Sequence, residues 1–201
     1  MNIKKIVITG GPCAGKSTAM QRVRAHFSAK GNTVLVIPET ATELIGGGIA
    51  PWTCATPYDY QVIQLRLQAK KEELFFQVAR QMNADTVMIL CDRGIPDGNA
   101  YMHDEDYLQM IAAEGLTPEM LFARYDAVFH LVTAADGALP YYTLANNTAR
   151  IETPEEAIAL DRRTLAAWDG HPYRRTIGNH CSFDEKLGML IEYITAFLNG
   201  A

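Results

Sequence analysis

The stretch that decides the fold reads Gly10-Gly11-Pro12-Cys13-Ala14-Gly15-Lys16-Ser17, and it follows the apolar run Lys5–Thr9 directly. It matches the pattern G-x-x-x-x-G-K-[ST] of a phosphate-binding loop, set between an apolar run and a helical one. Glycines allow the backbone N–H groups of such a loop to turn inward around a phosphate, at the positive end of a helix dipole. The sequence therefore predicts a strand, a phosphate loop and a helix in direct succession.

Two side chains at the end of this motif have the chemistry that a magnesium–triphosphate ligand requires. The Lys16 ammonium is a compact charge for the β- and γ-phosphates, and the Ser17 hydroxyl is a hard oxygen ligand for Mg²⁺. The predicted cofactors are therefore ATP or GTP together with Mg²⁺. The residues predicted to contact the nucleotide are Gly10, Gly11, Pro12, Cys13, Ala14, Gly15, Lys16, Ser17 and Thr18.

Five short runs outline a sheet. All but the last are nearly unbroken in apolar character, which is typical of strands in a parallel sheet covered on both faces. Segments with helical periodicity separate them, so strands and helices alternate and the predicted class is α/β. The predicted strands are Lys5–Thr9, Thr33–Pro38, Thr86–Cys91, Ala127–Val132 and Tyr173–Ile177.

Helix signals lie between these runs. A helix is expected over residues 16–30, after the phosphate loop, and the pair Thr56-Pro57 starts another. Two capping boxes predict further helices at about 154–168 and 182–198.

The composition bounds the class of protein. The chain has 201 residues, 48% of them hydrophobic, and a net charge of −5, which disfavours a nucleic-acid partner but is compatible with a small phosphate ligand. No linker or repeat interrupts it, so we expect residues 1–201 to form one domain, with a lid-like segment at about 134–165. The four cysteines are far apart, which favours reduced thiols and a cytoplasmic location. No apolar run is long enough to span a membrane.

Charged side chains stand where two of the predicted strands end. Ligands of open α/β sheets bind beyond the carboxyl ends of the strands, and Glu39, Asp92 and Arg93 lie there. Asp92 is suited to hold Mg²⁺ through water, Arg93 to orient an acceptor, and Glu39 to accept a proton from its hydroxyl. The alternatives are a solvated turn or structural ion pair for Asp92 and Arg93, and a helix cap for Glu39.

The lid-like segment and the helix after it carry Arg150, Arg162 and Arg163. Phosphoryl transfer requires positive charge near the transferred group, and arginines on a closing segment would supply it. An ordinary surface loop and helix with i,i+4 pairs is the alternative. Asn179, in the loop before the last helix, is a candidate for contact with the nucleotide base, or a simple turn residue.

With these motifs in place, the chain resembles the AAA-domain P-loop family named for the bacterial nicotinamide riboside kinase NadR and the fly TRPL-translocation-defect (Ttd) proteins. The blocks that carry the resemblance are ITGGPCAGKST, VIPETATELI with GGGIAPW, ILCDRGIPDGNAYM, RYDAVFHLVTAADG, LANNTARIETPEEAIALD and AAWDGHPYR. The resemblance implies a P-loop NTPase three-layer fold, with a five-stranded parallel sheet in the order 2-3-1-4-5, and nucleotide binding.

Deoxynucleoside kinases, to which that family is similar, have a glutamate after strand two and an acidic-Arg-Ser motif after strand three. Glu39 and Asp92-Arg93 match this pattern, but Gly94 replaces the serine. The Ttd branch is associated with GTP and phosphoinositides. Thr133-Ala134-Ala135-Asp136 lacks the lysine of a guanine-binding [NT]-K-x-D motif, and no lysine cluster indicates phosphoinositide binding.

Two functions follow from these patterns. The first is a kinase that transfers the γ-phosphate to a small nucleoside- or nucleotide-like acceptor in a pocket near Trp52, with Lys16, Glu39, Asp92 and Arg93 at the reacting groups. The second is a nucleotide-dependent switch with slow hydrolysis. An NTPase that acts on a macromolecular partner is the remaining alternative.

Overall fold

The structure is a computed structural model that describes residues 2–142 and 152–200. Its centre is a five-stranded, all-parallel sheet in the order β2-β3-β1-β4-β5. The strands are β1 (Asn2–Thr9), β2 (Thr33–Ile37), β3 (Thr86–Asp92), β4 (Ala127–Leu131) and β5 (Arg174–Ile177). This confirms the α/β class and the strand order that the resemblance implied.

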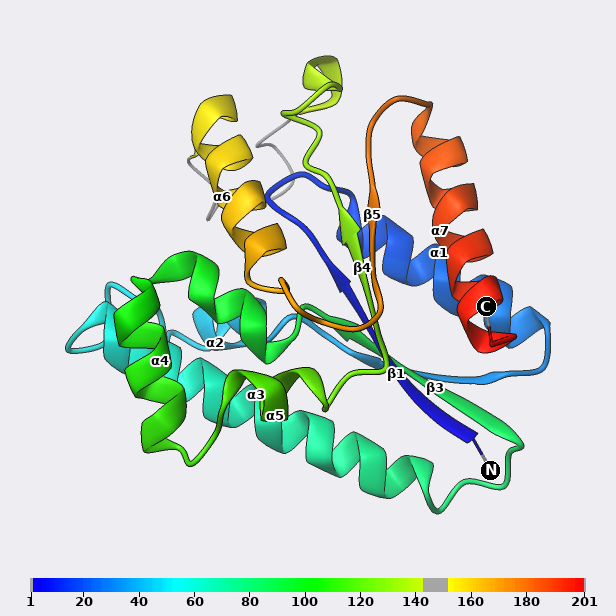
Figure 1. Cartoon of the computed structure of the whole chain (residues 1–201), viewed down its shortest axis with the longest axis horizontal. Helices are drawn as coiled ribbons and strands as arrows, with labels where there is room; N and C mark the ends of the chain where they lie inside the picture. The colour runs from blue at the N-terminus through cyan, green and yellow to red at the C-terminus, as the bar shows by residue number, and fades with distance from the viewer. Residues whose placement is uncertain (1, 143–151, 201) are drawn as a thin grey trace.

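Helices cover both faces of the sheet (Figure 1), which gives three layers. The helices are α1 (Lys16–Ala29), α2 (Thr40–Gly46), α3 (Pro57–Ala79), α4 (Asp104–Ala113), α5 (Pro118–Phe122), α6 (Pro154–Ala166) and α7 (Phe183–Leu198), with 3-10 segments η1 (Ile95–Tyr101) and η2 (Leu139–Tyr141).

The strand residues alternate between two cores, as the two-residue period of a strand requires. Ile6 and Ile8 of β1 pack in the core that α1 and α7 cover, whereas Val7 packs in the opposite core with Ala79 of α3 and with Trp168. All of these side chains are fully buried. Both faces of β1 are therefore apolar, which is why its sequence reads as an unbroken apolar run.

The helix starts confirm the capping signals. Thr56 Oγ1 accepts a hydrogen bond from Asp59 N at 3.1 Å, and the capping boxes at Thr153 and Ser182 are both formed. Several ends differ from the prediction by one to three residues. For example, β1 begins at Asn2, which pairs with Thr86, and β2 stops before Pro38, a residue with no N–H for the ladder.

Some of the structure had no prediction. The segment between β3 and β4 forms η1, α4 and α5, which share a small core of their own around Leu65, Tyr107 and Ile111. Within the described ranges, no helix combines the length and the apolar character that a membrane crossing needs.

Candidate functional site

The phosphate loop connects β1 to α1, and two of its glycines are fixed by close neighbours. A Cβ at Gly10 (φ 143°) would lie 2.1 Å from the carbonyl oxygen of Leu131 at the end of β4. A Cβ at Gly15 (φ 84°) would lie 2.5 Å from the Phe183 ring. Cys13 also has a positive φ, of 56°. These backbone angles are the ones glycine adopts readily, and they give the loop its tight curvature.

Lys16 lies across the mouth of this loop. Its side chain is buried, and its Nζ donates hydrogen bonds to the carbonyl oxygens of Gly10 and Gly11, each at 3.0 Å. The segment after β4 supports the loop from outside, because the Thr133 hydroxyl donates to Pro12 O and Ala134 N donates to Cys13 O. The ammonium is therefore held where the motif requires a cation for phosphate.

Asp161 of α6 also contacts the loop, and the sequence motifs do not predict this contact. Its Oδ1 accepts a hydrogen bond from Gly11 N at 2.5 Å and lies 3.2 Å from Nε2 of the fully buried His130. No local signal in the sequence singles it out. Ala157, Asp161 and Thr164 are the buried residues of α6, and these small and polar side chains do not mark an apolar face in the sequence.

Asp92 ends β3 beside Ile8 of β1, one residue before the loop strand ends. Its Oδ1 is buried and, among the described residues, has no hydrogen-bond partner. Burial raises the pKa of Asp92, although the nearby Lys16 charge acts in the opposite direction. A buried carboxylate oxygen without a partner, close to Lys16, has the chemistry of a ligand for a hard cation.

Arg93 has a left-handed backbone (φ 67°), held by a hydrogen bond from its N–H to Ile8 O. Its buried guanidinium donates from Nε to Glu39 Oε1 at 2.7 Å, and its Nη1 lies 3.9 Å from Asp97 Oδ1. Burial alone lowers the pKa of Arg93, but neighbouring Tyr101, Glu39 and Asp97 outweigh it and raise the pKa.

Glu39 occupies the N-cap position of α2, but its side chain makes no capping bond to the backbone. It accepts from Arg93 and, at 2.7 Å, from the Thr42 hydroxyl. Burial raises the pKa of this carboxyl, but the charges of Arg93 and Lys16 and the two hydrogen bonds outweigh it and bring the pKa to about 2. Glu39 is therefore an ionised partner of Arg93 at neutral pH.

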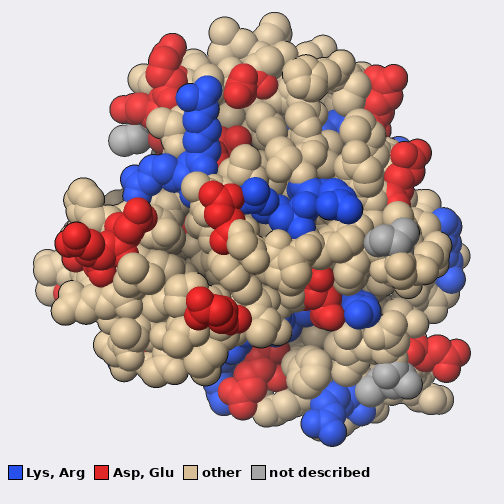
Figure 2. Space-filling model, in the orientation of Figure 1, with Lys and Arg blue, Asp and Glu red and all other residues tan. Residues whose placement is uncertain are grey.

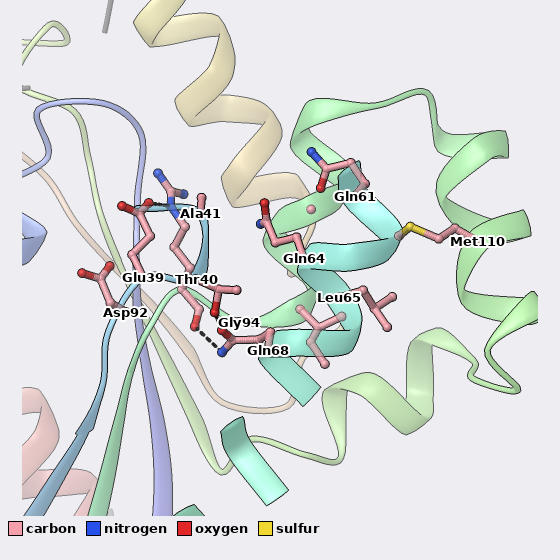
Figure 3. A pocket seen from close by; sticks show the side chains of 13 residues that line it. Glu39, Thr40, Ala41, Gln61, Gln64, Leu65, Gln68, Asp92, Gly94 and Met110 are labelled. Atoms are coloured by element: carbon pink, nitrogen blue, oxygen red, sulfur yellow. Dashed lines mark hydrogen bonds and ion pairs between the residues drawn. The ribbon is translucent and has the colours of Figure 1, made fainter. Parts of the chain in front are cut away.

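These charged groups line a small cavity, open to solvent, at the carboxyl edge of the sheet. Figure 3 shows Glu39 and Asp92 on one side and Gln61 and Gln64 of α3 facing them from the other. The lining residues are Glu39, Thr40, Ala41, Gln61, Gln64, Leu65, Gln68, Asp92, Arg93, Gly94, Ile95, Gly98 and Met110. Trp52, predicted to lie near the acceptor, is 70% exposed and does not line this cavity.

A buried ionic cluster supports the floor of the cavity. The fully buried Glu72 of α3 contacts Lys5 Nζ at 3.2 Å, Arg124 at 3.1 Å and the Tyr125 hydroxyl at 2.7 Å. It also accepts from Gln68 Nε2 at 2.9 Å, and Gln68 in turn accepts a hydrogen bond from the Thr40 hydroxyl. Strand β1 is thereby linked to the wall of the cavity.

The remaining predicted residues lie further out. Arg162 and Arg163 are exposed on α6, and Arg163 donates to Asn99 O at 3.3 Å and to Met102 O. Asn179 donates to Thr133 O and Asp136 O and accepts from Lys186 Nζ, so its carboxamide joins the loops after β4 and β5. Arg150 lies outside the described residues.

Charges of both signs are interspersed on the face that Figure 2 shows, and no broad basic field covers it. That face has no feature typical of a polyanion-binding surface.

The comparisons with known proteins identify a family. The family model described as AAA domain matches residues 5–186, which includes the phosphate loop, both carboxylates of the cavity, Asp161 and Asn179. A search of curated proteins gave no match.

Proposed function

We infer the function from the premise that this chain belongs to the AAA domain family, a P-loop NTPase-type family, and is therefore a nucleotide-binding protein. We propose that it is a kinase that transfers the γ-phosphate of ATP or GTP to a small nucleoside- or nucleotide-like acceptor. One observation carries the proposal: Glu39 and Asp92 both line a cavity beside the phosphate loop. The charge of Lys16, which belongs to that loop, acts to lower the pKa of both carboxyl groups. An acceptor in that cavity would lie next to the phosphate to be transferred.

Ser17 and Asp92 would hold Mg²⁺, because the unpartnered Oδ1 of Asp92 and the exposed Ser17 at the start of α1 are both hard oxygen donors. When bound, Mg²⁺ would neutralise charge on the β- and γ-phosphate oxygens. Arg150, Arg162 and Arg163 stay candidates for closing over the γ-phosphate, and Asn179 for the base side of the nucleotide.

Glu39 would act at the acceptor hydroxyl. A pKa of about 2 keeps Glu39 ionised, so it would accept a hydrogen bond from the hydroxyl and orient it. Positioning dominates in phosphoryl transfer, since the transition state is loose. Arg93 fixes Glu39 at 2.7 Å for this role.

A nucleotide-dependent switch with slow hydrolysis is the second candidate. The contact between Asp161 and Gly11 N favours it, because this contact connects the phosphate loop to α6. A ligand that changes the conformation of the loop would break or shift this contact and so change the position of α6. We also propose a cytoplasmic location, which the four free thiols support. The described residues give no support for phosphoinositide binding.

ADP or GDP release, measured with Mg²⁺ across nucleosides, nucleoside monophosphates and nicotinamide riboside, tests the two candidates. Release that depends on one acceptor supports the kinase, and a uniformly low rate with tight nucleotide binding supports the switch. Lys16→Ala should abolish binding or turnover, and an unaffected variant would exclude the loop from the site. Glu39→Gln should spare MgATP binding and slow transfer at least ~100-fold.

A further inference from the structure

One peptide unit of the phosphate loop is held from both sides. Lys16 Nζ donates to the carbonyl oxygen of Gly10 at 3.0 Å. The N–H of Gly11 belongs to the same peptide plane and donates to Asp161 Oδ1 at 2.5 Å. A cation at the oxygen and an anion at the N–H polarise this peptide in the same direction, so each contact strengthens the other. The two contacts should therefore be lost together.

The approach of α6 to this peptide is close. A Cβ at Gly11 would lie 2.7 Å from Asp161 Cβ and 2.8 Å from Asp161 Oδ1, so the helix comes as near to the loop as a glycine permits. The Asp161 side chain is buried, with 5% of the residue exposed. A buried carboxylate that leaves Gly11 N cannot be solvated in place and needs another partner.

His130 of β4 is such a partner. It is fully buried, and its Nε2 lies 3.2 Å from Asp161 Oδ1. Neither ring nitrogen makes a hydrogen bond within residues 2–142 and 152–200, so the imidazole is close to the carboxylate without being aligned with it. A buried polar ring without a hydrogen bond is unfavourable, and it calls for a physical reason. Asp161 thus has two donors within reach and is hydrogen-bonded to one of them.

The groups around this imidazole leave the carboxylate as its ionic partner. Its neighbours in the sheet, Thr9 of β1 and Thr176 of β5, are uncharged, and the Thr9 hydroxyl is bonded to Asp97 of η1. On the loop side, Lys16 donates to the loop carbonyls. On the side of α7, burial lowers the pKa of Lys186 to about 8, against the opposing effect of the α6 carboxylate. Lys186 is therefore mostly protonated at pH 7 and below, where histidines titrate.

We propose that Asp161 is a latch with two positions, bonded to Gly11 N in the nucleotide-free protein and to His130 when a nucleotide is bound. The phosphates draw Lys16 away from Gly10 O, which removes one of the two charges that polarise the peptide and weakens its contact with the carboxylate. The released carboxylate pairs with the imidazole, whose protonated form makes the stronger, charge-assisted bond. Nucleotide binding is thereby coupled to the uptake of a proton from the buffer. The latch rests on nucleotide binding alone, and it serves a kinase and a switch equally.

Calorimetry of MgADP binding between pH 7.5 and pH 6 tests the latch, in two buffers of different ionisation enthalpy at each pH. The affinity of the unmodified protein should rise ~5-fold more over this range than that of His130→Gln, because a hydrogen bond to a charged group is the stronger one. The unmodified protein should also take up more protons per nucleotide bound. Comparison with the variant removes the titration of the nucleotide itself, which is the same in both.

Two further variants complete the design. Asp161→Asn should lose the same pH dependence, because a neutral carboxamide gains little from a protonated imidazole. His103→Gln is the matched control, since His103 is exposed before α4 and this variant should keep the full pH dependence. If His130→Gln does not fold, the comparison with Asp161→Asn decides the question in its place.

The outcomes separate the latch from the function on which it rests. MgADP binding whose pH dependence and proton uptake are the same in the unmodified protein and in the His130 or Asp161 variant refutes the latch and leaves nucleotide binding intact. Loss of the pH dependence in His103→Gln also refutes the latch. An unmodified protein that binds no MgADP at any of these pH values refutes nucleotide binding, and the latch with it.

Discussion

The pair formed by Glu39 and Arg93 should make the stability of this protein depend on pH in a way that one substitution removes. The pKa of Glu39 lies at about 2, against an ordinary value of 4.5. That difference corresponds to about 3 kcal/mol of unfolding free energy at neutral pH. Because the side chain is 22% exposed, solvent screening reduces the expected value to about 2–3 kcal/mol.

The sign follows from the direction of the change. A carboxyl whose pKa is lower in the folded state contributes its full stability above pH ~5 and loses it as the pH falls through about 2. By pH ~3 the contribution of the Glu39 carboxyl to the unfolding free energy should be less than half of its value at neutral pH. The Glu39→Gln variant lacks this pH-dependent contribution. Its unfolding free energy should therefore be lower than that of the unmodified protein by about 2–3 kcal/mol at pH 7, and the difference should shrink towards zero near pH 2.

Urea denaturation at pH 7, 5, 4 and 3 measures this difference through the midpoint, provided the m-value is unchanged. Glu43→Gln is the control on the same helix, because Glu43 pairs with Lys71 at the surface and should contribute below about 1 kcal/mol. A difference for Glu39→Gln that is the same at pH 7 and pH 3, or no larger than that of the control, would refute the reasoning.

Three further outcomes follow from contacts in the structure. Glu72→Ala should lower the unfolding free energy by about 3–5 kcal/mol in urea denaturation, because it leaves Lys5 in the core without its carboxylate; a loss below about 1 kcal/mol would contradict the buried pair. Asp161→Asn keeps an acceptor for Gly11 N but removes a negative charge beside the loop, so calorimetry should give MgATP affinity ~3–10-fold higher, and weaker binding would count against it. Asp92→Asn should weaken the dependence of nucleotide binding on Mg²⁺ at least ~10-fold in a magnesium titration, and an unchanged titration would remove Asp92 from the metal site.

The sequence predicted the parts of this structure that depend on local patterns. The apolar run before Gly10 and the capping boxes at Thr153 and Ser182 are confirmed, because strand burial and helix caps are fixed by neighbours in the chain. Motif spacing also predicted polar residues at the mouths of β2 and β3, where Glu39 and Asp92 now line one cavity.

The contacts that the sequence did not predict are all between residues far apart in the chain. Asp161 meets Gly11 across 150 positions, and Glu72 meets Lys5 across 67. Nothing local distinguishes these carboxylates from solvated ones on a helix surface. Asn179 has contacts of the same kind, since its amide donates to Thr133 O and Asp136 O, while its contact with a nucleotide stays a prediction.

The near-contact between Gly10 and the Leu131 carbonyl has a consequence for the energetics of capture. Because the carbonyl at the end of β4 leaves no room for a side chain at Gly10, the backbone of the sheet sets the bend at the start of the loop. A triphosphate does not have to create that bend, so its affinity is spent on exchanging the contacts of Lys16 with the loop carbonyls rather than on ordering the chain.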